Sequence, residues 1–229
     1  MTYKSDEEIR SEVLFQLGWD WRVTPTDIGV VVKKGIVTLT GAVGSYAEKL
    51  AAKEAAHKVR GVLDVANEIE VRIPDAIERT DADIARAIRH ALDWDVFVPS
   101  EQIHSTVTQG WVTLEGNVES YYERLQAEQA VTHLLGVRGV TNKLVVVTTV
   151  KPARVKELIE EVLEVRADRE ADRVKVRVED GEVTLNGAVK TWDEKNSILG
   201  AVSHTPGVVT VHDHLIIDPY NLRAESAVR

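Results

Sequence analysis

The chain has 229 residues, no cysteine and a formal net charge of −9 at pH 7. The lack of cysteine excludes disulfides and thiolate metal sites, and it is compatible with a reducing compartment. Lysine and arginine are outnumbered by aspartate and glutamate in residues 1–75 (10 against 12), 76–149 (6 against 10) and 150–229 (12 against 15), so no part has the basic charge that nucleic-acid binding needs.

A seven-residue pattern with a glycine at each end occurs three times, as GIVTLTG at 35–41, GWVTLEG at 110–116 and GEVTLNG at 181–187. In every copy a further glycine follows the leading one by 26 residues (61−35, 136−110, 207−181). We interpret these residues as turn glycines: Gly35, Gly110, Gly181, Gly61, Gly136 and Gly207. The repeat predicts three small modules, at 1–74, 75–149 and 150–218, and a C-terminal tail at 219–229.

Each module is predicted to begin with a helix. In the first copy Ser5 and Glu8 have the spacing of a capping box, and apolar residues then recur at steps of four. The second copy has Thr80 and Asp83 at these positions. The third copy has Lys151-Pro152 instead, which places a proline at the first helical position.

Two strands, a second helix and a third strand are predicted to follow. Apolar residues alternate on both sides of the Lys34-Gly35 turn, which indicates a β-hairpin. Ser45 and Glu48 then begin a helix with another capping-box spacing, and an alternating run at 65–71 indicates the last strand. The same signals recur in the other copies, so the predicted order is α-β-β-α-β and the fold class is α+β.

This pattern resembles the BON domain of bacterial osmotic-stress, envelope and transport-associated proteins. The resemblance covers nearly the whole chain but is weaker in the third copy, where Asp213 replaces the asparagine found at positions 67 and 142. It implies three tandem modules, each with a mixed three-stranded sheet and two helices on one face. It also implies no catalysis, no cofactor and a proposed role in binding phospholipid or membrane surfaces. The family pattern consists of turn and core residues, so it supplies no binding residues.

No motif for catalysis is present, and we expect that the protein is not an enzyme. The best candidate for a metal site is the pair His212 and His214, because residues two apart on a strand point to the same face. The other copies have no histidine at these positions, and no third ligand is evident. We therefore interpret both histidines as solvent-exposed and expect no bound metal.

Aromatic residues recur at two positions of the repeat. Trp19 and Trp94 share one position after the first helix, near Trp21, and a second position begins the second helix of each module, at Tyr46, Tyr121 and Trp192. The recurrence is typical of packing against the module's own loops. The alternative is a row of amphipathic rings that meet a membrane interface or a partner.

Trp111 is an aromatic residue at a position where the other copies have Ile36 and Glu182. Strand alternation places it with Val145 and Val147 on the sheet face that no helix of its own module covers. An exposed patch of this kind predicts contact with a neighbouring module or with a second chain, which would make a homo-oligomer through module 2.

The predicted function is therefore that of a non-catalytic adaptor that binds membrane lipid or a protein partner and no nucleic acid. The alternative is a cytosolic stress-response interaction protein without lipid affinity. The first ten residues carry no apolar run, so a cytoplasmic location is expected, although many relatives in the resembling family lie in the bacterial envelope.

Overall fold

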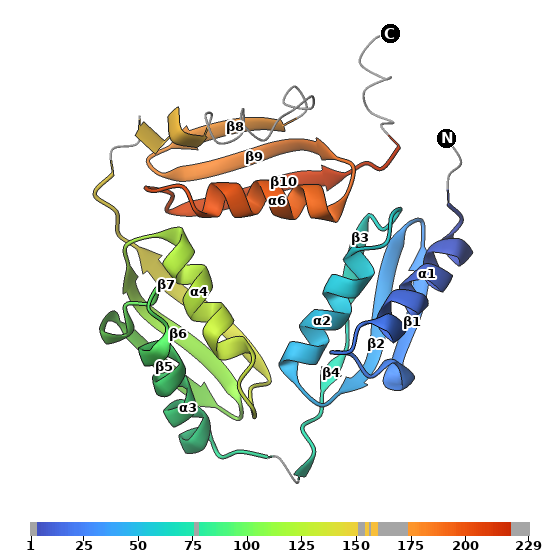
Figure 1. Cartoon of the computed structure of the whole chain (residues 1–229), viewed down its shortest axis with the longest axis horizontal. Helices are drawn as coiled ribbons and strands as arrows, with labels where there is room; N and C mark the ends of the chain where they lie inside the picture. The colour runs from blue at the N-terminus through green and yellow to red at the C-terminus, as the bar shows by residue number, and fades with distance from the viewer. Residues whose placement is uncertain (1–3, 76–77, 151–153, 156, 160–173, 221–229) are drawn as a thin grey trace.

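The computed structural model describes residues 4–75, 78–150, 154–155, 157–159 and 174–220. These residues form three α+β modules that are arranged as a triangle (Figure 1). Each module contains one mixed sheet, as the sequence predicts.

Module 1 contains the hairpin and parallel third strand that define the repeat. Its elements are α1 (Asp6–Trp19), the 3₁₀ helix η1 (Pro25–Asp27), β1 (Ile28–Lys33), β2 (Ile36–Val43), α2 (Tyr46–His57), β3 (Asp64–Asn67) and β4 (Glu70–Val71). β1 is antiparallel to β2, and both β3 and β4 run parallel to β2 on its other side. The third strand of this module is therefore interrupted once, between β3 and β4.

Modules 2 and 3 have an unbroken third strand. Module 2 contains α3 (Asp81–Trp94), η3 (Ser100–Gln102), β5 (Ile103–Thr108), β6 (Trp111–Val118), α4 (Tyr121–Thr132) and β7 (Gly139–Val146). Module 3 contains β8 (Val174–Glu179), β9 (Glu182–Val189), α6 (Trp192–Ser203) and β10 (Thr210–Ile217). In both sheets the middle strand pairs antiparallel with the first strand and parallel with the third. The Lys151-Pro152 helix start predicted for module 3 lies outside the described residues.

The predicted helix caps are present wherever the structure describes them. Ser5 with Glu8 and Thr80 with Asp83 form complete capping boxes. The second helices use a variant of the box. In α2, for example, Ser45 Oγ accepts from the Glu48 N–H, whereas the Glu48 carboxylate accepts from the N–H of Gly44, one residue before the cap.

Each module has its own hydrophobic core between its helices and one face of its sheet. In module 1 the core joins Ile9, Val13 and Leu17 of α1 to Val37 and Leu39 of β2. Equivalent residues form the cores of modules 2 and 3. Three separate cores of this size leave each module modestly stable alone, so contacts between modules contribute to the stability of the whole.

A polar position ties the third strand to the second helix in every module. Asn67 Nδ2 donates to the Lys49 carbonyl oxygen at 2.8 Å, and Asn142 Nδ2 donates to the Arg124 carbonyl oxygen at 2.8 Å. In module 3 the Asp213 carboxylate instead lies 2.8 Å from Lys195 Nζ. The departure of Asp213 from the repeat is thus matched by an ion pair that makes the same connection.

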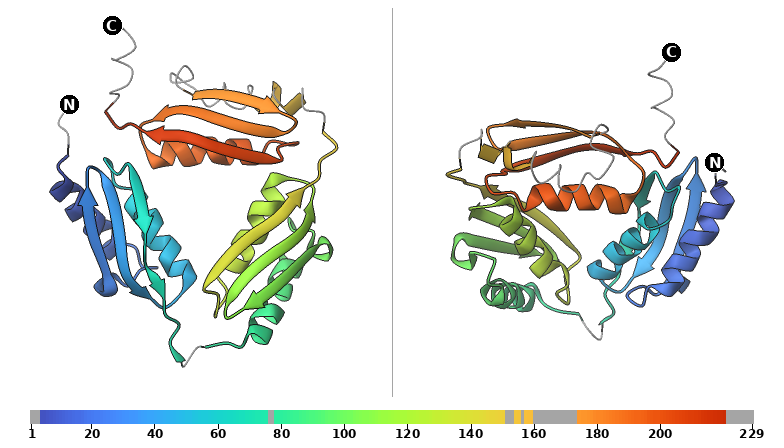
Figure 2. Two further views of the ribbon diagram at one scale, coloured as in Figure 1. Left: turned by 180° about the vertical axis from the view of Figure 1, so that it is seen from behind. Right: turned by 45° about the horizontal axis from the view of Figure 1, so that its top comes forward.

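The triangle has two different sides. Figure 1 views the side on which α1, α2, α3 and α4 lie in front of their sheets, which we call the helix side. Figure 2 (left) views the opposite side, where the sheets of modules 1 and 2 lie in front, which we call the sheet side. The sheet faces that no helix covers therefore point away from the helix side.

Candidate functional site

Apolar side chains gather at the C-terminal ends of α1 and α3. In module 1 this group, the module 1 aromatic end, consists of Phe15, Trp19 and Trp21; in module 2 the equivalent group, the module 2 aromatic end, consists of Trp94, Val96 and Phe97. All six are exposed, with Trp19 at 78% and Trp94 at 84% of full exposure. Solvent-facing tryptophans at the same position of two modules form a recurrent apolar feature of the described surface.

Local hydrogen bonds fix the turn that presents each aromatic end. The Asp20 carboxylate accepts from the backbone N–H of Arg22 at 3.1 Å and from its guanidinium at 2.8 Å. This pairing with Arg22 lowers the pKa of Asp20 to about 2 and raises the pKa of Arg22. In module 2 Asp95 Oδ1 accepts from the Phe97 N–H at 2.9 Å. The tryptophans therefore project from ordered turns.

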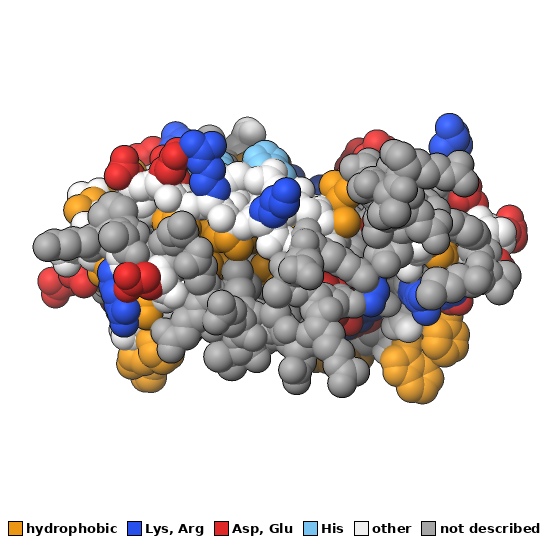
Figure 3. Space-filling view, turned by 90° about the horizontal axis from the view of Figure 1, so that it is seen from above, with side chains coloured by type: hydrophobic (Ala, Val, Ile, Leu, Met, Phe, Trp, Pro, Cys, Tyr) orange, Lys and Arg blue, Asp and Glu red, His pale blue; other side chains and the backbone are white. Residues whose placement is uncertain are grey.

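The helices α1 and α3, whose ends carry the two aromatic ends, lie in front of their sheets on the helix side (Figure 1). Figure 3 views the molecule from above, so the side that faces the viewer in Figure 1 is at the bottom of the picture. Hydrophobic side chains protrude there at two corners, one over module 1 and one over module 2. The equivalent segment of module 3 lies within residues 160–173, outside the described residues.

The aromatic residues that begin the second helices contact neighbouring modules, and Tyr121 also packs on the core of its own module. Tyr46 packs on the core of module 2, and Tyr121 packs on the cores of modules 2 and 3. Burial raises the pKa of the Tyr46 phenol, the Glu128 carboxylate adds to the rise, and a backbone hydrogen bond from Val140 opposes it. Trp192 completes the cycle by stacking on His57 of module 1. Each module thus contacts the next through the same position of the repeat.

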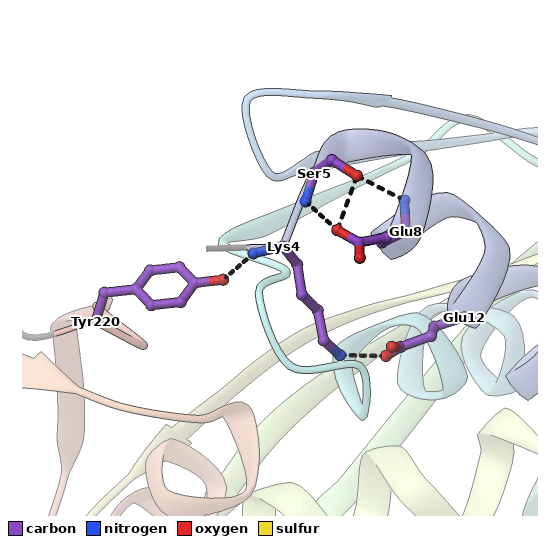
Figure 4. A network of polar contacts seen from close by, with 5 residues as sticks. All are labelled: Lys4, Ser5, Glu8, Glu12 and Tyr220. Atoms are coloured by element: carbon purple, nitrogen blue, oxygen red, sulfur yellow. Dashed lines mark hydrogen bonds and ion pairs between the residues drawn. The ribbon is translucent and has the colours of Figure 1, made fainter. Parts of the chain in front are cut away.

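The first and last described residues also meet at the contact between modules 3 and 1. The backbone N–H of Lys4 donates to the Tyr220 hydroxyl at 3.0 Å, and the Lys4 ammonium pairs with Glu12 (Figure 4). Lys4 directly precedes the Ser5 and Glu8 capping box of α1. The segment after β10 therefore approaches the start of α1 and closes the triangle.

Trp111, Val145 and Val147 lie exposed on the uncovered face of the module 2 sheet. Trp111 is 58% exposed, so the expected contact of this face with a neighbouring module is not found among the described residues. A contact with a second chain stays a prediction. The structure supplies another reason for the tryptophan: its ring covers Gly139, its partner on β7, where an added Cβ would lie 2.3 Å from the indole.

The remaining predicted residues form no site in the part of the chain that the structure describes. His212 and His214 are exposed, and His212 Nε2 lies 3.3 Å from Glu182 Oε2. No three histidine or acidic side chains in the described ranges are placed to share a metal ion. None of the described helices has the length and apolar character needed to cross a membrane.

All six turn glycines have positive φ angles: Gly35, Gly110, Gly181, Gly61, Gly136 and Gly207.

Sequence reasoning missed two sets of structural residues. Asp6 and Asp81 each accept from two backbone N–H groups of a hairpin turn, at Lys34 and Gly35 in module 1 and at the equivalent turn in module 2. The second set is the stack of His57 and Trp192. Asp6 and Asp81 occupy equivalent positions, which was an available signal, whereas His57 has no histidine counterpart in the other copies.

Comparisons with known proteins agree with the repeat. The BON domain family matches residues 5–73, 80–148 and 153–219. Osmotically-inducible protein Y of Escherichia coli is 32% identical over 148 residues, which cover 62% of this chain and 73% of that protein.

Two solved structures are distant matches. CdsD, a structural protein of the type III secretion system of Chlamydia trachomatis, has 14% identity and a TM-score of 0.27, with coverage of 95% of this chain and 96% of that chain. A structure of its C-terminal domain has 13% identity and a TM-score of 0.26, with 94% and 100% coverage. Scores this low carry no argument about module arrangement. The family matches, in contrast, cover almost the whole sequence, and this chain belongs to the BON domain family, with three tandem copies of the domain.

Proposed function

We propose that this protein is a non-catalytic adaptor that attaches to phospholipid surfaces through the helix side of its triangle. The observation that carries the proposal is the presence of two exposed aromatic ends on α1 and α3, the helices that lie on that one side. Tryptophan suits the boundary between lipid and water because its ring is apolar while its indole N–H donates a hydrogen bond. The relation to osmotically-inducible protein Y supports a role in a stress response.

The charge of the protein indicates how the surface is recognised. A chain with a net charge of −9 is not attracted to anionic headgroups, and Arg22 beside Trp21 is already paired with Asp20 and Glu54. Attachment therefore depends on apolar insertion. We expect binding to zwitterionic vesicles that is at least as strong as binding to anionic vesicles and that changes little with salt.

Vesicle flotation of a double variant tests the role of the aromatic ends. Trp19→Glu combined with Trp94→Glu should lower the affinity for phosphatidylcholine vesicles at least tenfold, because each buried tryptophan contributes about 25 cal/mol per Å² of apolar surface. The parent should also show a blue shift of tryptophan emission when vesicles are added.

Trp111→Glu is the matched control, because Trp111 is also exposed but lies on the uncovered sheet face. It should leave flotation unchanged. Equal flotation of the parent and the double variant would contradict the proposed surface. If the parent does not float with any vesicle composition, the alternative of a stress-response protein-interaction role without lipid affinity is favoured.

A further inference from the structure

The contact between modules 3 and 1 is the only side of the triangle that no linker between consecutive modules spans. We call it the closing joint and define it by Trp192 of α6 and His57 of α2. The two rings lie flat on each other, with centroids 3.6 Å apart and an interplanar angle of 9°. His57 Nε2 and Trp192 Nε1 are both buried there without a hydrogen-bond partner. Each of these two atoms destabilises the closed joint, because burial removes its hydrogen bond to water and no protein group replaces that bond.

The charges around His57 oppose a further positive charge. Three charged groups of the described residues act on His57: Lys53 from its own helix, Lys195 from α6 across the joint and Asp64 from β3. Lys195 Nζ lies 5.1 Å from the centre of the Trp192 ring. The Asp213 carboxylate at 2.8 Å and the Leu215 carbonyl oxygen at 2.7 Å hold it in place. The lysine is therefore fixed near the stack when the joint is closed.

We propose that protonation of His57 opens the triangle at the closing joint, so that module 3 separates from module 1 in acid while each module stays folded. A protonated imidazole in the closed joint would be partly desolvated and repelled by Lys53 and Lys195, with Asp64 as the one acidic group that acts on it among the described residues. When the joint is open, water solvates the imidazole and Lys195 moves away with module 3. The protonated form thus favours the open state.

The direction of the pH effect follows from the pKa of His57. Burial is the largest cause, Lys53 and Lys195 also lower this pKa, Asp64 raises it, and together they take it from 6.5 to about 4. Closure is therefore fully stable above pH 6.5 and loses stability as the pH falls toward 4. Each pH unit in this window changes the opening equilibrium by at most tenfold, and solvent access to the half-buried ring reduces the change. We expect the opening equilibrium constant to rise by tens of fold in total between pH 6.5 and 4.

Fluorescence energy transfer across the closing joint measures the opening directly. The chain has no cysteine, so one label can be placed on α1 by Ser11→Cys and another on β8 by Lys175→Cys, both at exposed positions. Transfer should fall reversibly between pH 6.5 and 4 in the labelled parent, with unchanged far-ultraviolet circular dichroism. It should stay constant in His57→Gln, which has no titrating ring. His133→Gln, at an exposed site in module 2, is the matched control and should respond like the parent.

The His57→Gln variant could already be open at neutral pH, and constant energy transfer would then not test the proposal. A second measurement covers this case. The His57 ring resonances of the unlabelled full chain should titrate well below pH 6.5, and in Trp192→Ala the midpoint should return toward 6.5. An acid response in His57→Gln equal to that of the parent would overturn the proposal. So would constant transfer in the parent, or a His57 midpoint that Trp192→Ala leaves unchanged.

Discussion

At the scale of single residues, an added Cβ would meet a backbone oxygen at two glycines of the same hairpin, but at different distances. Gly110 has a φ of 78° in the turn, and an added Cβ would lie 2.7 Å from the Gly136 carbonyl oxygen. Gly116 has a φ of 133°, and its Cβ would lie 2.1 Å from the carbonyl oxygen of Gln102. Both oxygens belong to the backbone, so no side-chain movement relieves either conflict, and the conflict at Gly116 is the closer one.

These distances predict a ranking of alanine substitutions. Gly116→Ala should destabilise module 2 by more than Gly110→Ala, which should itself cost about 1–3 kcal/mol. Gly18→Ala is the control, because Gly18 lies in α1 with no atom within 4 Å of an added Cβ. It should stabilise module 1 slightly. Thermal unfolding of the three variants checks the order, and a Gly116→Ala protein as stable as the parent would contradict it.

At the scale of elements, an aspartate in the first turn of a helix holds the neighbouring hairpin. Asp81 of α3 accepts from the N–H groups of Gln109 and Gly110 at 2.8 and 2.9 Å. Asp81→Ala should therefore destabilise module 2 by about 1–3 kcal/mol, since two charge-assisted hydrogen bonds are lost. Hydrogen exchange at these two amides should accelerate, whereas the Glu123 amide, capped by Ser120, should not change. Unchanged exchange at Gln109 and Gly110 would show that the two hydrogen bonds to Asp81 do not form in solution.

The elements themselves were predictable because their signals are local. Hydroxyl residues three positions before an acidic residue marked the helix starts, and alternating valines marked the strands. The order α-β-β-α-β is confirmed in modules 1 and 2, and the described part of module 3 confirms its β-β-α-β portion. The parallel pairing of the third strand was predicted only from the family resemblance. Local sequence signals do not show it, because the paired strands are far apart in the chain. The hydrogen bonds of Asp81 were missed because their partners, Gln109 and Gly110, lie 28 and 29 positions away in the chain. Asp6 makes the same contact in module 1.

At the scale of the whole molecule, the repeat produces a cyclic arrangement of contacts. Tyr46, Tyr121 and Trp192 share one position of the repeat, and each reaches the following module. The sequence showed that an aromatic residue recurs at this position but not what it contacts. Packing on the module's own loops would produce the same recurrence as packing on the next module. Trp111, in contrast, does not recur in the other copies, and this difference suggested an interface. The structure shows its ring covering Gly139 of its own module.

Circular permutation tests whether the three contacts are interchangeable. A short glycine linker would join Tyr220 to Lys4, whose atoms already meet at 3.0 Å, and the new ends would lie at residues 76–77 between modules 1 and 2. The permutant should fold to the same shape at neutral pH, because the linker keeps the closing joint at high effective concentration. The joint without a linker is then the one at Tyr46, whose raised pKa leaves the phenol neutral throughout the acid range. The permutant should therefore not expand between pH 6.5 and 4 in small-angle X-ray scattering, whereas the parent should. Expansion of both proteins over the same pH range would place the acid response outside the contact of His57 with Trp192.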